Sequence, residues 1–243
     1  MKVVAHRGNS SVAPQNTLAA LEAAWRAQAD AIEVDVHLTA DRQVVVIHDD
    51  TVDATTDGTG AVSGLTLDQV RELDAGAWFS SAFAGQPVPT FTELLAFVEC
   101  RDLGLLLEVK GAWTVADVRL VTEPLRAAGL TERVVAQSFE ASTVAALRDA
   151  APGLRRALLL EERPPDGVDA LADELGAVAV NPDGSLLLSD PGFVARQHAA
   201  GRAVAVWTLD EPWMWATAAE LGVDAVITNR PDRLRGWLAA HEA

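Results

Sequence analysis

The strongest constraint on the fold is a regular alternation of short β-rich runs with helical segments. The eight runs expected to form strands are Val3–His6, Ala31–His37, Leu105–Lys110, Val134–Phe139, Arg156–Leu160, Ala177–Asn181, Ala203–Leu209 and Ala225–Thr228. Helical segments such as Thr17–Ala29, Ala141–Ala150 and Pro212–Leu221 separate them. Strands that alternate with helices indicate a parallel sheet, and eight such units predict an α/β fold, a closed (β/α)8 or TIM barrel.

Two segments interrupt this repeat. Val44–His48 predicts an extra strand, because residues 39–42 between it and the second strand have the composition of a hairpin turn. Residues 49–89 are rich in Asp, Thr, Gly and Ser, with a short helical piece near Leu67–Leu73. We expect this segment to be a small insertion over the barrel mouth, within one domain that spans residues 1–243.

Charge and composition limit the partners. The chain carries 19 basic and 35 acidic residues, a net charge of −16, which argues against nucleic acid as a partner. No apolar run approaches the ~20 residues that span a bilayer. Cys100 is the only cysteine, so no intrachain disulfide can form. We expect a soluble, cytoplasmic protein without a signal peptide that acts on a small molecule.

Three carboxylates fall at the ends of two predicted barrel strands. Glu33 and Asp35 are two residues apart and share one strand face, and Glu108 and Lys110 repeat this spacing on the next barrel strand. An oxygen-only ligand set suits Mg²⁺ or Ca²⁺ better than Zn²⁺. Spacing alone leaves equally open an internal layer of ion pairs with Arg7 and Lys110, without a metal.

Two histidines come from different strand ends. His6 and His48 are placed to face each other across the carboxylates, where one could accept a proton and the other donate one. His37 shares the face of Glu33 and receives no role. We expect His198 and His241 at the surface.

These residues lie within motifs that resemble the bacterial glycerophosphodiester phosphodiesterase family. The matching motifs are His6-Arg7-Gly8, Pro14-Gln15-Asn16-Thr17, Glu33-Val34-Asp35, Ile47-His48-Asp49, Glu108-Val109-Lys110, Ser138-Phe139, Val206-Trp207-Thr208 and Ile227-Thr228-Asn229-Arg230-Pro231-Asp232. They stand in the family's order and extend to about residue 235. The segment from Asp74 to Phe79, followed by Val88-Pro89-Thr90, also resembles the family's insertion.

The resemblance implies a TIM-barrel enzyme that hydrolyses glycerophosphodiesters to sn-glycerol 3-phosphate and an alcohol, with one divalent metal ion, Mg²⁺ or Ca²⁺, as cofactor. It assigns His6 and His48 as the acid–base pair, Glu33, Asp35 and Glu108 as metal ligands, and Arg7, Lys110 and Trp207 as substrate-binding residues. Trp207 would line the glycerol end. The alternative for Trp207 is a packed core aromatic, since tryptophan is mostly buried in folded proteins.

The chain departs from the family pattern at two positions. Gln15 stands where the family usually has Glu, and Ala54 stands where Arg is common. Gln15 keeps a hydrogen-bonding group but loses a charge, which would affect metal affinity or the pH optimum. Ala54 falls in the insertion and bears on substrate preference more than on catalysis.

Three other functions are compatible with parts of this pattern. A lysophospholipase D-type enzyme would use the same residues on a lipid-bearing diester. A class I aldolase would use Lys110 as a Schiff-base lysine, which leaves the histidines and carboxylates without a role. A non-catalytic barrel that binds phosphodiesters would show binding without turnover.

Overall fold

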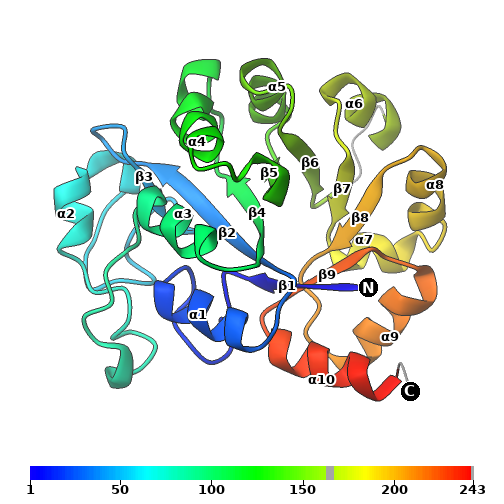
Figure 1. Cartoon of the computed structure of the whole chain (residues 1–243), viewed down its shortest axis with the longest axis horizontal. Coiled ribbons are helices and arrows are strands. Elements are labelled where there is room, and N and C mark those ends of the chain that lie inside the picture. The colour runs from blue at the N-terminus through cyan, green and yellow to red at the C-terminus, as the bar shows by residue number, and fades with distance from the viewer. Residues whose placement is uncertain (163–166, 242–243) are drawn as a thin grey trace.

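One sheet closes into a barrel at the centre of the molecule. The computed structural model describes residues 1–162 and 167–241 (Figure 1). The parallel barrel strands are β1 (Lys2–His6), β2 (Ala31–Leu38), β4 (Gly104–Val109), β5 (Val134–Ser138), β6 (Arg155–Leu160), β7 (Ala179–Pro182), β8 (Ala203–Val206) and β9 (Ala225–Thr228). Because β1 pairs with both β9 and β2, the sheet has no open edge among these strands. The predicted (β/α)8 barrel is confirmed.

Helices surround the barrel and connect successive strands (Figure 1). They are α1 (Leu18–Arg26), α3 (Phe91–Glu99), α4 (Val115–Ala127), α5 (Ala141–Ala150), α6 (Val168–Leu175), α7 (Gly184–Ser189), α8 (Phe193–Ala199), α9 (Pro212–Leu221) and α10 (Pro231–His241). Threonine side chains cap the first turns of three of them, at Thr17, Thr90 and Thr114. Over the described ranges, no helix combines the length and apolar character needed to cross a membrane.

Local hydrogen bonds shift some strand boundaries from the predicted ones. β7 begins at Ala179 rather than Ala177, because the Ala177 amide still closes the end of α6 by donating to the Ala172 carbonyl. β8 ends at Val206, before Trp207. The extra strand is β3 (Val44–Val46), which runs antiparallel to β2 as expected for the predicted hairpin.

The segment after β3 forms a small hydrophobic cluster of its own. It contains α2 (Leu67–Arg71) and two short 3₁₀ turns, Val62–Gly64 and Ser81–Phe83. Figure 1 shows α2 beside β3, to one side of the barrel strands. The residues of this cluster are Val45, Ile47, Val52, Val62, Val70, Ala75 and Val88. The expectation that residues 49–89 form an insertion over the mouth, within one domain, stays a prediction.

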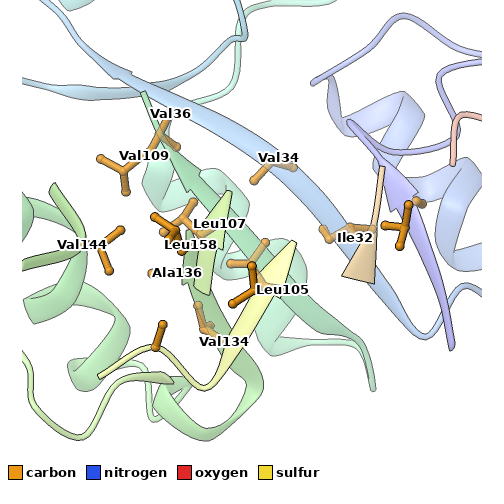
Figure 2. Close-up of a cluster of buried hydrophobic side chains, with 14 of the residues drawn as sticks. Ile32, Val34, Val36, Leu105, Leu107, Val109, Val134, Ala136, Val144 and Leu158 are labelled. Carbon is orange, nitrogen blue, oxygen red and sulfur yellow. The ribbon is translucent and has the colours of Figure 1, made fainter. Parts of the chain in front are cut away.

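Alternation along each strand separates an apolar outer face from the barrel interior. Figure 2 shows outward-facing side chains of β2, β4 and β5, including Val34, Leu107 and Ala136, in one buried cluster with Val144 of α5. The inward-facing residues Val4, Leu106, Ala225 and Ile227 form a second, smaller cluster. On β1 and β4 the next inward positions toward the carboxyl end are polar, His6 and Glu108. The alternation of side chains along the strands therefore places a layer of polar side chains directly above this inner apolar cluster.

A tight turn follows β1 and brings α1 against it. Arg7 and Gly8 both have left-handed backbone conformations, with φ of 56° and 82°. A Cβ on Gly8 would lie 2.6 Å from the carbonyl carbon of Ala20 and 2.7 Å from its oxygen. Only glycine fits at this position, since helix backbone cannot move aside without displacing α1.

We expect Gly8→Ala to lower the free energy of unfolding by about 3 kcal/mol or more, because it combines a left-handed conformation with overpacking. Gly129→Ala is the matched control: Gly129 has φ of 69°, but no atom lies within 4 Å of the point that its Cβ would occupy. That variant should lose only about 1 kcal/mol. Urea denaturation measures both values, and equal losses would contradict the steric explanation.

Candidate active site

Seven of the eight predicted site residues line one cavity of about 290 Å³ at the carboxyl ends of the barrel strands. They are His6, Arg7, Glu33, His48, Glu108, Lys110 and Trp207. The cavity is completed by Gln137, Phe139, Leu159, Glu161 and Ile227. The eighth residue, Asp35, is fully buried and contacts Arg7 and Lys110. The structure thus brings together all eight predicted site residues, and their roles stay predictions.

The three carboxylates form a compact group. One oxygen from each of Glu33, Asp35 and Glu108 lies within 4.8 Å of the others, and all three residues are buried. Strand register produces this arrangement, because His6 pairs with Glu33 and Asp35 pairs with Glu108. Oxygen-only ligand groups of this kind suit Mg²⁺ or Ca²⁺.

Only one of the two carboxylate oxygens of Glu33 has a hydrogen-bond partner among the described residues. Its Oε2 accepts a hydrogen bond of 3.0 Å from the backbone N–H of Arg7. Its buried Oε1 has no hydrogen-bond partner in the part of the chain that the structure describes. An unpaired buried carboxylate oxygen is costly, so this atom points to a cation as its missing partner.

Asp35 and Glu108 have cationic partners. Lys110 Nζ lies 3.3 Å from Asp35 Oδ1 and 2.6 Å from Glu108 Oε1. Arg7 Nε lies 3.4 Å from Asp35 Oδ2, which also accepts a hydrogen bond of 2.8 Å from Asn16 Nδ2. The ion-pair layer considered from the sequence is therefore present, but it leaves Glu33 without a side-chain cation in contact among the described residues.

The three carboxyl groups titrate differently. Burial and the neighbouring charge of Asp35 raise the pKa of Glu33 well above its usual value, and the same two causes raise the pKa of Glu108 to about 7. Burial alone would raise the pKa of Asp35, but Lys110 and Arg7 together lower it. The protein's own cations therefore stabilise one carboxylate fully, and a divalent cation would favour ionisation of the other two.

His6 is held in one tautomer by a chain of hydrogen bonds. Asp210 accepts hydrogen bonds from the backbone N–H and from Nδ2 of Asn229, at 2.8 and 2.7 Å. The Asn229 side chain therefore turns its Oδ1 toward His6, 2.8 Å from Nδ1. Because that oxygen can only accept, Nδ1 carries the proton and Nε2 keeps its lone pair. Burial, and next the charge of Arg7, lower the pKa of His6 to about 4.

His48 has a carboxylate partner instead. Its Nδ1 lies 2.6 Å from Asp49 Oδ1, and its side chain is 28% exposed. Burial lowers the pKa of His48 as well. His37 donates from Nε2 to the backbone carbonyl of His48 over 2.9 Å, so this histidine supports the segment that carries His48. The two histidines expected at the surface are exposed: His198 lies in α8 and His241 at the end of α10.

Gln15, one of the two positions at which the chain departs from the family pattern, orients Arg7. Gln15 Oε1 accepts a hydrogen bond of 3.0 Å from Arg7 Nη1. The expected hydrogen bond is thus kept although the charge is lost. Ala54, the second departure, is exposed in the segment after β3.

Trp207 packs against the inner apolar cluster that includes Leu106 and Ile227, and it also forms a wall of the cavity. Its indole N–H donates to the Asn181 carbonyl over 2.9 Å. Its ring stands at 85° to that of Phe139, with 5.4 Å between the centroids. The two sequence-based interpretations of Trp207, core residue and cavity wall, therefore both describe its position.

Sequence reasoning gave no role to the residues that orient the site. Asn16 and Asn229 both fall inside the quoted motifs, and each hydrogen-bonds a predicted site residue. Asp210 and Gln137 carried no recognisable signal, because the residues that they contact, Asn229 and Asn181, are distant from them in sequence or lie on a non-adjacent strand.

Comparison with known proteins identifies the family. The sequence matches the glycerophosphoryl diester phosphodiesterase family over residues 6–233. The chain belongs to this family. A glycerophosphodiester phosphodiesterase of Caldanaerobacter subterraneus is 33% identical over 235 residues, which cover 96% of this chain and 95% of that protein. The recognition made from the motifs is confirmed.

Solved structures agree with the assignment. A glycerophosphodiester phosphodiesterase from Agrobacterium tumefaciens superposes with a TM-score of 0.84 at 29% identity, and covers 97% of this chain and 99% of its own. An Oleispira antarctica phosphodiesterase in complex with the product sn-glycerol-3-phosphate gives a TM-score of 0.91 at 26% identity, with 98% and 97% covered.

In this family member we expect Glu108→Gln to stabilise the cation-free protein, relative to wild type, more at pH 8 than at pH 5. A carboxyl whose pKa rises from its usual 4.5 to about 7 on folding contributes stability below pH 4.5, and this contribution is lost as pH rises through 7. The Gln side chain cannot ionise, so the variant does not lose this stability. Its free energy of unfolding at pH 8 should therefore exceed that of wild type by about 1–3 kcal/mol.

Urea denaturation in EDTA at both pH values measures the difference, with Glu140→Gln, an exposed glutamate outside the cavity, as control. The same change in stability at pH 5 and pH 8 would show that Glu108 is not destabilised by its ionisation.

Proposed function

We propose that this phosphodiesterase-family chain hydrolyses glycerophosphodiesters to sn-glycerol 3-phosphate and an alcohol, by acid–base catalysis between His6 and His48 and with a divalent cation held by Glu33, Asp35 and Glu108. The observation that carries the proposal is one cavity in which both histidines, the carboxylate group and two cationic side chains meet. This combination matches the needs of a phosphodiester: charge neutralisation, proton removal and proton supply.

Arg7 and Lys110 would bind the phosphate. Both line the cavity, and their contacts with Asp35 fix the two cationic groups on the same side. Their charges offset the negative charge on the nonbridging phosphoryl oxygens. A cation bound at the carboxylate group would add Lewis-acid polarisation of those oxygens.

The hydrogen bonds of the two histidines support different roles. His6 presents an unprotonated Nε2, so it would accept the proton of the attacking water or hydroxyl. Arg7 is one cause of its low pKa, and a bound phosphate would offset that charge and raise the pKa toward the working range. His48 donates to Asp49, and this carboxylate favours the imidazolium that would protonate the leaving alcohol.

The aldolase alternative is disfavoured by Lys110. Burial would lower the pKa of its ammonium, but the charges of Asp35 and Glu108 raise it above the usual value. A Schiff-base lysine attacks as the neutral amine, so it needs the opposite shift.

We expect chelator-sensitive release of sn-glycerol 3-phosphate from glycerophosphocholine, restored by Mg²⁺ or Ca²⁺. His6→Gln and His48→Gln should each lower kcat by about 10²–10⁴, because each removes one proton-transfer step. His198→Gln is the control, since His198 lies in α8 and contacts Asp224 rather than the cavity. An enzyme-coupled assay of glycerol 3-phosphate measures all four proteins.

Turnover that persists in EDTA would contradict the proposed cation requirement. Full activity in either cavity histidine variant would contradict the proposed acid–base pair. A folded wild-type protein that releases no glycerol 3-phosphate with either cation would overturn the proposal for this substrate.

A further inference from the structure

We propose that Gln137 is a specificity-determining residue that donates an amide N–H to a hydroxyl of the substrate's glycerol, and that Asn181 is the positioning residue that orients this amide. The inference rests on the proposed glycerophosphodiesterase function and names the recognition of its glycerol end. It does not depend on which cation binds.

Gln137 occupies the strand position next to the carboxylate group. It lies on β5 directly opposite Glu108 of β4, and both side chains line the same cavity. Only 1% of the residue is exposed. A buried amide in such a place needs hydrogen-bond partners for both its oxygen and its nitrogen.

The orientation of the Gln137 amide follows from a backbone group on a distant strand of the barrel. The backbone N–H of Ala205 on β8 donates to Asn181 Oδ1 over 3.2 Å, which fixes this atom as the oxygen. Asn181 therefore directs its Nδ2 toward Gln137, where it donates to Oε1 over 2.8 Å. The remaining polar atom of Gln137 must be the donor Nε2.

This donor has no acceptor within the part of the chain that the structure describes. Gln137 Oε1 is used by Asn181, whereas none of the hydrogen bonds of residues 1–162 and 167–241 involves Gln137 Nε2. The Asn181 carbonyl accepts its hydrogen bond from the indole N–H of Trp207. The chain thus holds an unused neutral donor on a residue that lines the cavity.

An unused donor beside a carboxylate matches the hydrogen bonding of a hydroxyl. A hydroxyl carries one proton to donate and lone pairs that accept. It can donate to Glu108 and accept from Gln137, whereas Arg7 and Lys110 are engaged with Asp35 and serve the phosphate. A site built in this way discriminates against an analogue that lacks the hydroxyl, because its own polar groups are then left unpaired.

The test uses two ligands with the same three-carbon chain. Calorimetry in the presence of Mg²⁺ or Ca²⁺ gives the affinities for sn-glycerol 3-phosphate and for n-propyl phosphate, which lacks both hydroxyls. In Gln137→Met, which keeps the side-chain length, we expect the preference for glycerol 3-phosphate to fall about 3–10-fold, the usual range for one hydrogen bond. Affinity for n-propyl phosphate should change less than about 2-fold, the scatter of a substitution that leaves its contacts intact.

Asn181→Asp tests the positioning role without deleting a buried side chain. One carboxylate oxygen can still accept from Ala205, but the other would also accept, so the Gln137 amide would rotate and present its carbonyl to the cavity. Two acceptors then face one hydroxyl proton, and the preference should fall as in Gln137→Met. A role in folding alone would shift both affinities together.

The outcomes separate the two proposals. A ligand preference that is unchanged in both variants, or affinities that fall equally for both ligands, overturns the inference while wild-type turnover of glycerophosphocholine leaves the proposed function intact. Wild-type protein that binds neither ligand overturns the inference, and wild-type protein that also releases no glycerol 3-phosphate overturns both. Loss of preference in both variants, with wild-type thermal unfolding midpoints, supports the assignment.

Discussion

The arrangement of the site depends on how three buried carboxylates are balanced by charge. Asp35 contacts both Arg7 and Lys110 and is held ionised, whereas Glu33 and Glu108 have raised pKa values. Two protein cations are too few for three carboxylates at this depth, since burial of an unpaired charge is costly. The imbalance supports a third, external cation, which the carboxylates of β2 and β4 would hold beside the histidines and the phosphate-binding groups.

The barrel provides this arrangement through register rather than through flexible loops. Parallel pairing of β1, β2, β4 and β5 sets His6, Glu33, Asp35, Glu108 and Gln137 at adjacent inward positions. The left-handed turn at Arg7-Gly8 then directs the Arg7 backbone N–H to Glu33 and its guanidinium to Asp35. Strands therefore carry His6 and the three carboxylates, and the other site residues follow directly or closely after strand ends, which favours a preorganised electrostatic environment.

The sequence predicted most of the fold and seven of the residues that line the cavity, because both follow from local patterns. Period-two alternation placed Glu33 and Asp35 on one face, and the motifs marked His48 and Lys110. The sequence did not predict the orienting partners: Asp210 is linked to His6 through Asn229, and Asn181 of β7 contacts Gln137 of β5, with β6 between them. Such contacts depend on strand register and on side-chain rotation, which no short sequence window encodes. The left-handed conformation of Arg7 was likewise not visible from residue type.

We expect a cation that binds the carboxylate group to force ionisation of Glu108 and Glu33. Calorimetric titration of the protein with Mg²⁺ or Ca²⁺, in buffers of different ionisation enthalpy, measures the protons released on binding. Because the pKa of Glu108 is about 7, binding should release protons at pH 6, and this release should decline by pH 8.5. Cation binding without proton release at pH 6, or no binding at either pH, would contradict a cation site of this kind. The three carboxylates would then serve only in ion pairs with Arg7 and Lys110.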